Sequence, residues 1–111
     1  MNFSYQAEKF SAARRSLMLP HVKGEAQSIA SAFHECSLGL LDLPTDDLDE
    51  YVRDWLNQLK DLMDTSGIDD TSGLGNWALK AEQMTADQKF ELSRVIDELA
   101  DWFEREFWRD D

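Results

Sequence analysis

The sequence predicts an all-α protein, a compact bundle of four main helices with one further short helix. Apolar residues recur at helical spacing in four segments, and residues that start or stop helices separate those segments. β-Branched residues are few and never alternate over a useful length, which argues against strands. The 111 residues suit a single domain, residues 1–111, that is large enough to bury a hydrophobic core.

The first two helices are expected over residues 3–18 and from about residue 25 to 41. Pro20 separates them, because proline disfavours continuation of a helix. Arg14 falls inside the first apolar face, where we expect it to extend to solvent or to pair with a carboxylate. The apolar faces comprise Phe3, Ala7, Phe10, Leu17 and Met18, and then Ala26, Ile29, Phe33, Cys36 and Leu40.

The third helix is expected over residues 46–64. Thr45 is a suitable N-cap, and Asp46 and Asp47 would lie in the first turn, where the helix dipole favours negative charge. Its broad apolar face should place Trp55 and Leu59 in the core. The whole face comprises Leu48, Val52, Trp55, Leu59, Leu62 and Met63.

A loop rich in Gly, Ser and Asp is expected over residues 65–76, and a short helix around 77–83. The stretch from Thr85 to Gln88 fits a capping box, which predicts that the last helix starts at Ala86 and runs to about residue 108. Leu99 should lie at the centre of its buried face. That face comprises Leu92, Val95, Ile96, Leu99, Phe103 and Phe107.

Negative charge is concentrated in one part of the chain. The formal charge is −12. Residues 1–40 hold four basic and three acidic side chains, whereas residues 41–111 hold seven basic and twenty acidic ones. Such an acidic protein repels nucleic acid and anionic membranes and attracts basic partners. The charge therefore predicts a basic protein as the partner, although a strongly solvated surface would look the same.

An acidic stripe on the third helix is the first candidate binding site. At about 100° per residue, Asp47, Glu50, Asp54, Asp61 and Asp64 fall on one side, opposite the apolar face. Like charges four residues apart on a helix repel by a few tenths of a kcal/mol. A helix face that only needs to be solvated could carry acidic and basic residues equally well. The stripe predicts contact with a basic surface, and a merely solvated face stays open as the alternative.

The last helix carries a second candidate binding site. Phe90 and Trp108 fall at the same angle, away from the apolar face, and share that side with Asp97, Asp101 and Glu104. Large aromatic residues among carboxylates are typical of binding hot spots. Together the two candidates predict seven partner-binding residues: Asp47, Glu50, Asp54, Asp61, Asp97, Asp101 and Trp108.

Catalytic, metal and cofactor sites are not expected. His34 and Cys36 are the nearest approach to a reactive cluster, but Leu38 stands where a zinc-binding HExxH motif needs its second histidine. Cys36 is better explained as a small buried hydrophobic residue. The loop over residues 64–73 lacks the ligand spacing of a calcium-binding loop, and residues 73–75 do not make a phosphate loop. We therefore expect a protein that is not an enzyme and needs no metal or cofactor.

The expected location is the cytoplasm. The lone cysteine excludes an intrachain disulfide, and the N-terminal residues lack the basic start and apolar run of a signal peptide. No apolar stretch approaches the roughly 20 residues that a membrane span needs.

In size, helicity and acidity, and in the stretch Asp46-Asp47-Leu48-Asp49-Glu50-Tyr51, the chain resembles the small acidic immunity proteins of bacterial toxin systems. Proteins of that class bind a cognate toxin and block it. The resemblance implies a bacterial inhibitor that neutralises a basic, nuclease-type toxin by masking its active site. It is a likeness of class, so it implies no roles for individual residues.

Two other functions remain open. The chain could mimic nucleic acid and inhibit a DNA- or RNA-handling complex, which uses the same charge complementarity with a different partner. Alternatively, it could be a helical adaptor or oligomerisation module, in which the aromatic residues matter more than the charge. Affinity should fall steeply with ionic strength in the first two cases and change little in the third. The pattern leaves the oligomeric state open.

Overall fold

The structure is a computed structural model that describes residues 3–69 and 75–109. This described part contains five α-helices, one short 3₁₀-helix and no strand. The α-helices are α1 (Ser4–Ser16), α2 (Glu25–Leu40), α3 (Glu50–Met63), α4 (Asn76–Gln83) and α5 (Ala86–Arg109), and the 3₁₀-helix η1 covers Thr45–Asp47. The prediction of four main helices and one short helix is confirmed.

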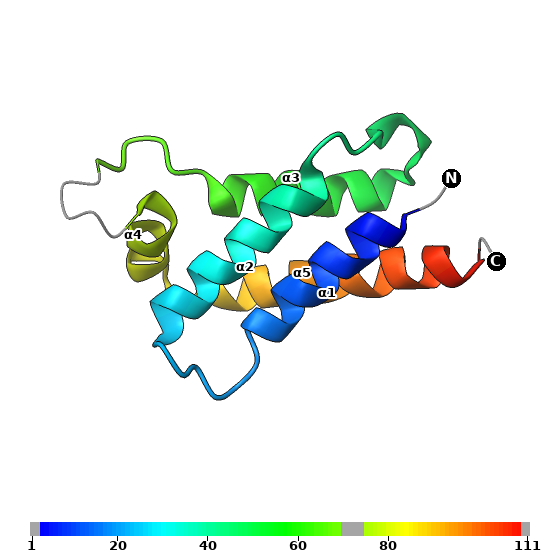
Figure 1. Cartoon of the computed structure of the whole chain (residues 1–111). Coiled ribbons are helices and arrows are strands. Elements are labelled where there is room, and N and C mark those ends of the chain that lie inside the picture. Colours follow the sequence, from blue (N-terminus) through cyan, green and yellow to red (C-terminus); the bar gives the residue numbers. More distant parts are fainter. Residues whose placement is uncertain (1–2, 70–74, 110–111) are drawn as a thin grey trace.

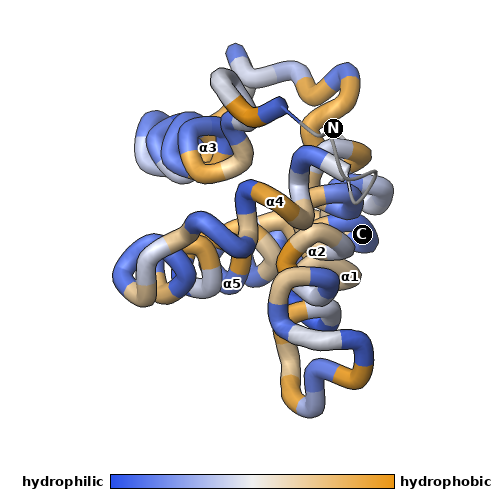
Figure 2. Tube along the Cα trace, turned by 90° about the vertical axis from the view of Figure 1, so that its left-hand side faces the viewer, coloured by the Kyte–Doolittle hydropathy of each residue, from blue (hydrophilic) through white to orange (hydrophobic). Residues whose placement is uncertain are grey.

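The long helix α5 is the element on which two separate parts of the bundle pack. Helix α1 contacts both α2 and α5, α2 contacts α4, and α3 contacts α5. Figure 1 shows α1 and α2 running antiparallel in front of α5. In Figures 1 and 2, α3 lies toward the upper edge and the α1–α2 loop forms the lower edge, with α5 between them.

Aromatic side chains hold α1 on α5. The ring of Phe103 in α5 is fully buried, and the ring of Phe10 stacks on it with centroids 5.2 Å apart. Phe3 meets the same ring edge-on at 5.3 Å. Pairs of this kind contribute about 0.5–1.5 kcal/mol each beyond the area that they bury. The periodic apolar residues of both helices therefore converge on one aromatic centre, as their spacing predicts.

Gly39 lets α1 approach α2 closely. A Cβ atom at this position would lie 3.1 Å from the Phe10 ring and 3.3 Å from the Cβ of Lys9. Those distances are tighter than ordinary van der Waals contact, so even an alanine would require the buried Phe10 ring to shift by a few tenths of an ångström.

Helix α3 is joined to α5 by side-chain hydrogen bonds as well as by apolar contact. The indole Nε1 of Trp102 donates to the hydroxyl oxygen of Tyr51 over 3.0 Å. Nearer the start of α5, the guanidinium of Arg94 donates to the Gln58 side-chain oxygen over 3.1 Å. These two bonds fix the rotation of α3 about its axis, so its opposite side is turned to solvent. In Figure 2 the hydrophilic residues of α3 lie on its outer side.

The prediction that one helix covers residues 46–64 with Thr45 as its N-cap is wrong at the start. Thr45 opens the 3₁₀-helix η1 instead, and Leu48 after it is extended, with ψ 147°. Leu48 is buried in the core, and reaching the core requires this extended turn between η1 and α3. Helix α3 then starts at Glu50, preceded by Asp49, whose side chain makes no capping hydrogen bond.

The buried face of α3 also differs from the predicted one. Val52 and Leu59 are buried as expected, but the central position between them belongs to Leu56, and Trp55 is only half-buried. Trp55 lies at the edge of the face, one turn after Tyr51, whose hydroxyl accepts the hydrogen bond from Trp102 of α5. The Trp55 ring instead meets the Tyr51 ring edge-on, with centroids 5.1 Å apart.

The predicted capping box at the start of α5 is confirmed. The backbone N–H of Gln88 donates to the Thr85 hydroxyl over 3.1 Å, and the backbone N–H of Thr85 donates to the Gln88 side-chain oxygen over 2.9 Å. The two bonds satisfy donors that would otherwise lack a partner in the first turn. Leu99, predicted as core, is fully buried farther along the same helix.

Candidate protein-binding surfaces

The outer side of α3 carries three exposed carboxylates, which we call the acidic face: Glu50, Asp54 and Asp61. All three were predicted from the sequence as partner-binding residues. Among the described residues, none of the three forms an ion pair. Arg53 and Lys60 are also exposed on α3, and they too form no ion pair with any described residue. The carboxylates of the acidic face are therefore left to solvent.

Most carboxylates of α1, α2 and α5 are compensated within the chain, although Asp87 and Glu98 of α5 form no ion pair with a described residue. Lys89 of α5 pairs with Glu25 of α2, and its hydrogen bond lowers the pKa of the Glu25 carboxyl. Arg94 donates to Glu91 over 2.7 Å, which lowers the pKa of the Glu91 carboxyl. The described ion pairs all join residues of α1, α2 and α5, and none includes a residue of α3.

The predicted site residues Asp97 and Asp101 belong to this compensated group. Arg14 of α1 reaches across to α5, with its guanidinium 3.3 Å from Asp97 and 3.7 Å from Glu104. The expectation that Arg14 pairs with a carboxylate is thus confirmed. Asp101 pairs with Arg105 of the same helix over 3.1 Å. These carboxylates offer less free negative charge to a partner than the acidic face does.

Two members of the predicted stripe lie outside α3. Asp47 belongs to η1, so the helical-angle argument does not apply to it, and its side chain lies outside the described part. Asp64 follows the last residue of α3 and accepts hydrogen bonds from the backbone N–H and the hydroxyl of Ser66. Both bonds lower the pKa of the Asp64 carboxyl. Asp64 therefore shapes the end of α3 and the turn after it.

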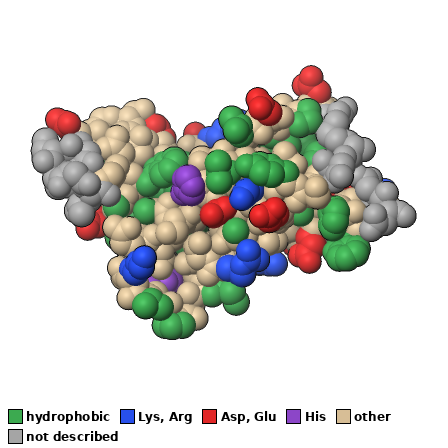
Figure 3. Space-filling model, viewed as in Figure 1, with side chains coloured by type: hydrophobic (Ala, Val, Ile, Leu, Met, Phe, Trp, Pro, Cys, Tyr) green, Lys and Arg blue, Asp and Glu red, His purple; other side chains and the backbone are tan. Residues whose placement is uncertain are grey.

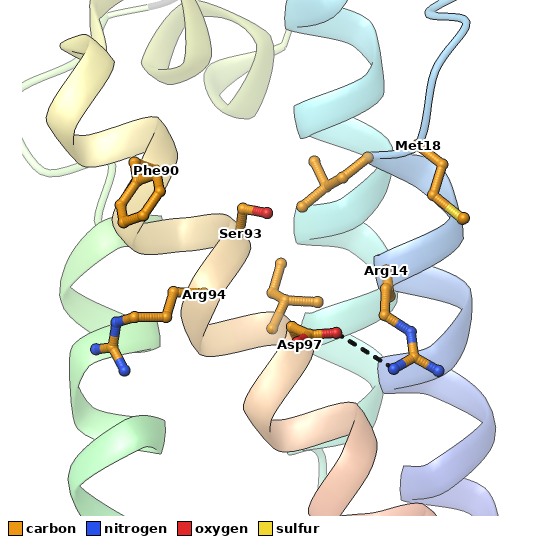
Figure 4. A pocket seen from close by; sticks show the side chains of 8 residues that line it. Arg14, Met18, Phe90, Ser93, Arg94 and Asp97 are labelled. Atoms are coloured by element: carbon orange, nitrogen blue, oxygen red, sulfur yellow. Dashed lines mark hydrogen bonds and ion pairs between the residues drawn. The ribbon is translucent and has the colours of Figure 1, made fainter.

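Phe90 and Trp108 are both exposed, as predicted, at 72% and 64% of their surface. They lie near opposite ends of α5, so they are not parts of one cluster. The Trp108 ring rests against Phe107, with centroids 5.3 Å apart. Phe90 lines a groove between α1 and α5, shown in Figure 4, which also contains Met18 and the Arg14–Asp97 pair. An aromatic ring at each end of α5 is thus free to contact another molecule.

A surface that the sequence reasoning missed lies at the α1–α2 loop. Helix α1 was expected to continue to residue 18, but it ends at Ser16, and Met18 is 62% exposed instead of covering the core. Figure 3 shows hydrophobic and basic side chains along this lower edge. The sequence signal was available, since residues 18–23 mix apolar and basic residues in an otherwise acidic chain.

His21 in this loop has a partner that the sequence did not reveal. Its ring Nδ1 lies 3.0 Å from the hydroxyl of Ser28 in α2. That contact ties the loop to the start of α2 and so helps to position the exposed residues around it.

The cysteine and the metal-ligating residue types were the candidates for reactive chemistry. Cys36 is fully buried, and burial raises the pKa of its thiol to about 12. A thiol in this state is not a nucleophile at neutral pH. Within residues 3–69 and 75–109, no three His, Cys, Asp or Glu side chains gather as metal ligands would. The loop segment 70–74, on which the calcium-loop and phosphate-loop comparisons partly fall, lies outside the described residues.

Comparison of the chain with protein-family models, with curated proteins and with solved structures found no match. Among the described helices, none is long and apolar enough to cross a membrane.

Proposed function

We propose that this chain is a non-enzymatic binding protein whose acidic face covers a basic surface of a partner protein and thereby inhibits it. The observation that carries this proposal is the contrast in compensation. Most carboxylates of α1, α2 and α5 are paired with cations of the chain, whereas none of Glu50, Asp54 and Asp61 on α3 is paired with a described residue.

The structure gives the acidic face a rigid support. The buried side of α3 is anchored by Val52, Leu56 and Leu59, and the bonds to Tyr51 and Gln58 from α5 restrain its rotation. A preorganised charged surface loses less side-chain and backbone freedom on binding than a flexible one. The acidic face can therefore meet a partner without rearrangement of the bundle.

The electrostatics favour a cationic protein surface as the partner. Glu50 and Asp54 are four residues apart on α3 and repel one another by a few tenths of a kcal/mol. Partner cations would relieve that repulsion, and the net charge of −12 would steer their approach. A surface that binds nucleic acid has the required positive charge. We therefore propose a nucleic-acid enzyme as the partner, and specifically a nuclease-type toxin neutralised by an immunity protein.

Inhibition by mimicry of nucleic acid is the second candidate, and it rests on the same unpaired carboxylates. In that case the partner is a DNA- or RNA-handling complex of the cell instead of a toxin. The two cases differ in what the partner does and not in how it is bound. Identification of a partner recovered with the chain from its native host separates them.

The test of the acidic face is charge reversal. The double variant Glu50→Lys with Asp54→Lys should bind the recovered partner at least about tenfold more weakly, and its affinity should depend less on salt. The fold should survive because both positions are exposed. Titration of purified proteins at two salt concentrations measures both effects, and circular dichroism checks the fold.

The matched control reverses two exposed carboxylates outside α3. Glu82 and Asp69 are exposed and form no ion pair with any described residue. The variant Glu82→Lys with Asp69→Lys changes the net charge by the same amount and should bind nearly as well as the wild type. If the α3 variant binds as tightly as the wild type, the acidic face is only a solvated surface. Equal loss in both variants would mean that net charge alone acts.

A further inference from the structure

A groove of about 390 Å³ lies between the end of α1, the α1–α2 loop and the first half of α2. It occupies the edge of the molecule opposite α3 (Figure 1). The side chains that line it are Arg15, Ser16, Met18, Pro20, Val22, Lys23, Gln27, Ser28 and Ser31. We call it the basic groove.

The charge of the basic groove is opposite to that of the protein as a whole. Its described lining contains two cations, Arg15 and Lys23, and no carboxylate. Both cations are exposed, and neither forms an ion pair with another described residue. In a chain with 23 acidic side chains and 11 basic ones, two neighbouring cations could easily have been compensated. They remain available to an anionic ligand.

Exposed apolar surface adjoins these cations. Val22 is 88% exposed and Met18 is 62% exposed, although burial of such side chains is worth about 1.5–3 kcal/mol each. Met18 also lines the neighbouring groove that contains Phe90 (Figure 4), so the two grooves share this exposed apolar side chain. Methionine adapts its shape to varied partners, which suits a contact surface.

We infer that the basic groove is a second interaction surface that binds an acidic segment of a protein, with carboxylates near Arg15 and Lys23 and apolar side chains covering Met18 and Val22. The exposed side chains of Gln27 and Ser31 add hydrogen-bond donors along the α2 side of the groove. The inference is independent of the acidic face, because the two surfaces lie on opposite edges of the molecule and attract ligands of opposite charge.

The same observations disfavour two other anionic ligands. Single-stranded nucleic acid is held by stacking on aromatic rings, and the described lining contains none. An anionic membrane is an extended charged plane that would repel a protein of net charge −12. A short acidic segment avoids most of this repulsion, since charges beyond about 8 Å are largely screened at physiological salt.

The test uses three labelled amphipathic peptides that differ only in their polar residue. The acidic probe has Leu and Glu at helical spacing, and the other two carry Gln or Lys in place of Glu. Fluorescence anisotropy with the full chain should show the acidic peptide binding at least about fivefold more tightly than the Gln peptide. The difference should shrink as salt is raised.

Variants place the binding in the basic groove. Arg15→Glu with Lys23→Glu should weaken binding of the acidic peptide at least about fivefold, and Val22→Ser should weaken it about twofold or more. The matched control is Arg53→Glu with Lys60→Glu, which changes the net charge equally by reversing two exposed, uncompensated cations on α3. That control should change binding less than about twofold.

Three outcomes would overturn the inference. The acidic peptide could bind no better than the Gln peptide, or both double variants could lose affinity equally, which would show sensitivity to net charge only. In the third outcome the acidic peptide does not bind, but phosphatidylglycerol vesicles or a single-stranded oligonucleotide do. Their binding is then abolished by Arg15→Glu with Lys23→Glu. Sedimentation should give the variants the same oligomeric state as the wild type. Helical circular dichroism spectra like that of the wild type would show that a variant that loses binding is still folded.

Discussion

Cys36 is the single cysteine of the chain, and it is packed as a core residue. The thiol is fully buried in the core, and burial raises its pKa to about 12 from an ordinary value of 9.0. The nearby Glu35 carboxylate acts in the same direction as burial. Cys36 therefore behaves as a small hydrophobic residue, as its position in the apolar stripe of α2 predicts.

This raised pKa predicts a dependence of stability on alkaline pH. The unfolded thiol ionises near pH 9, whereas the folded thiol does not, so stability present below that pH is lost as the pH rises toward 12. At about pH 10 the loss should be on the order of 1 kcal/mol. Urea unfolding of the wild type and of Cys36→Ala between about pH 8 and 10 measures it. If the free energy of unfolding changed with pH in the same way in both proteins, the Cys36 thiol would have an ordinary pKa in the folded protein, which would contradict the prediction.

Leu99 is fully buried at the centre of α5, and its truncation tests the core. Leu99→Ala should lower the free energy of unfolding by about 2–5 kcal/mol, because it removes apolar contacts and leaves a cavity. Phe90→Ala on the same helix removes a larger side chain that is 72% exposed, and it should cost about 0.5 kcal/mol or less. Urea midpoints give both values. Equal losses would mean that α5 packs by another face.

At the scale of the helix, local sequence determines a start only when the tertiary structure does not compete. Thr85 and Gln88 complete their capping box because the neighbouring core residue, Met84, stands before the N-cap and so does not interrupt the first turn of α5. Thr45 has an equally good capping side chain, but the burial of Leu48 interrupts the helix after η1. The gain from burying one leucine exceeds the roughly 1 kcal/mol of an N-cap.

The capping box predicts a measurable difference between the starts of α5 and α3. Thr85→Ala should destabilise the protein by about 0.5–2 kcal/mol, because it removes the hydroxyl that accepts from the N–H of Gln88. Asp49→Ala at the start of α3 should cost less, since the Asp49 side chain makes no capping hydrogen bond. Thermal unfolding compares the two variants. A larger loss at Asp49 would contradict the observed caps.

At the scale of the whole molecule, charge is separated between two edges. Uncompensated carboxylates lie on α3, together with the uncompensated cations Arg53 and Lys60, whereas the basic groove at the α1–α2 loop contains uncompensated cations and no described carboxylate. Helix α5 stands between them with its own charges largely paired, through Arg14, Arg94 and Arg105. The basic groove thus attracts anions, although the net charge of −12 implies repulsion of them, whereas the acidic face attracts cations as the net charge does. The two proposed surfaces follow from this separation.

Local pattern was sufficient to place the helices of this protein, apart from the start of α3 and the end of α1. Apolar residues at helical spacing, the capping box at Thr85 and the break at Pro20 are short-range features, and the observed elements follow them. The exposure of Phe90, Trp108 and the three carboxylates of the acidic face also follows from helical angle alone. Each of these features depends on residues within a few positions of one another, so it can be predicted from the amino-acid sequence.

Only the tertiary structure decided which charges are free. Arg14 compensates Asp97 from 83 residues away, and this pairing depends on how α1 docks on α5. The early end of α1, which exposes Met18 and opens the basic groove, and the turn that buries Leu48 are likewise set by packing. Side-chain charge can be counted along a sequence, but its compensation depends on distances in space, because ion pairing falls off within a few ångströms in water.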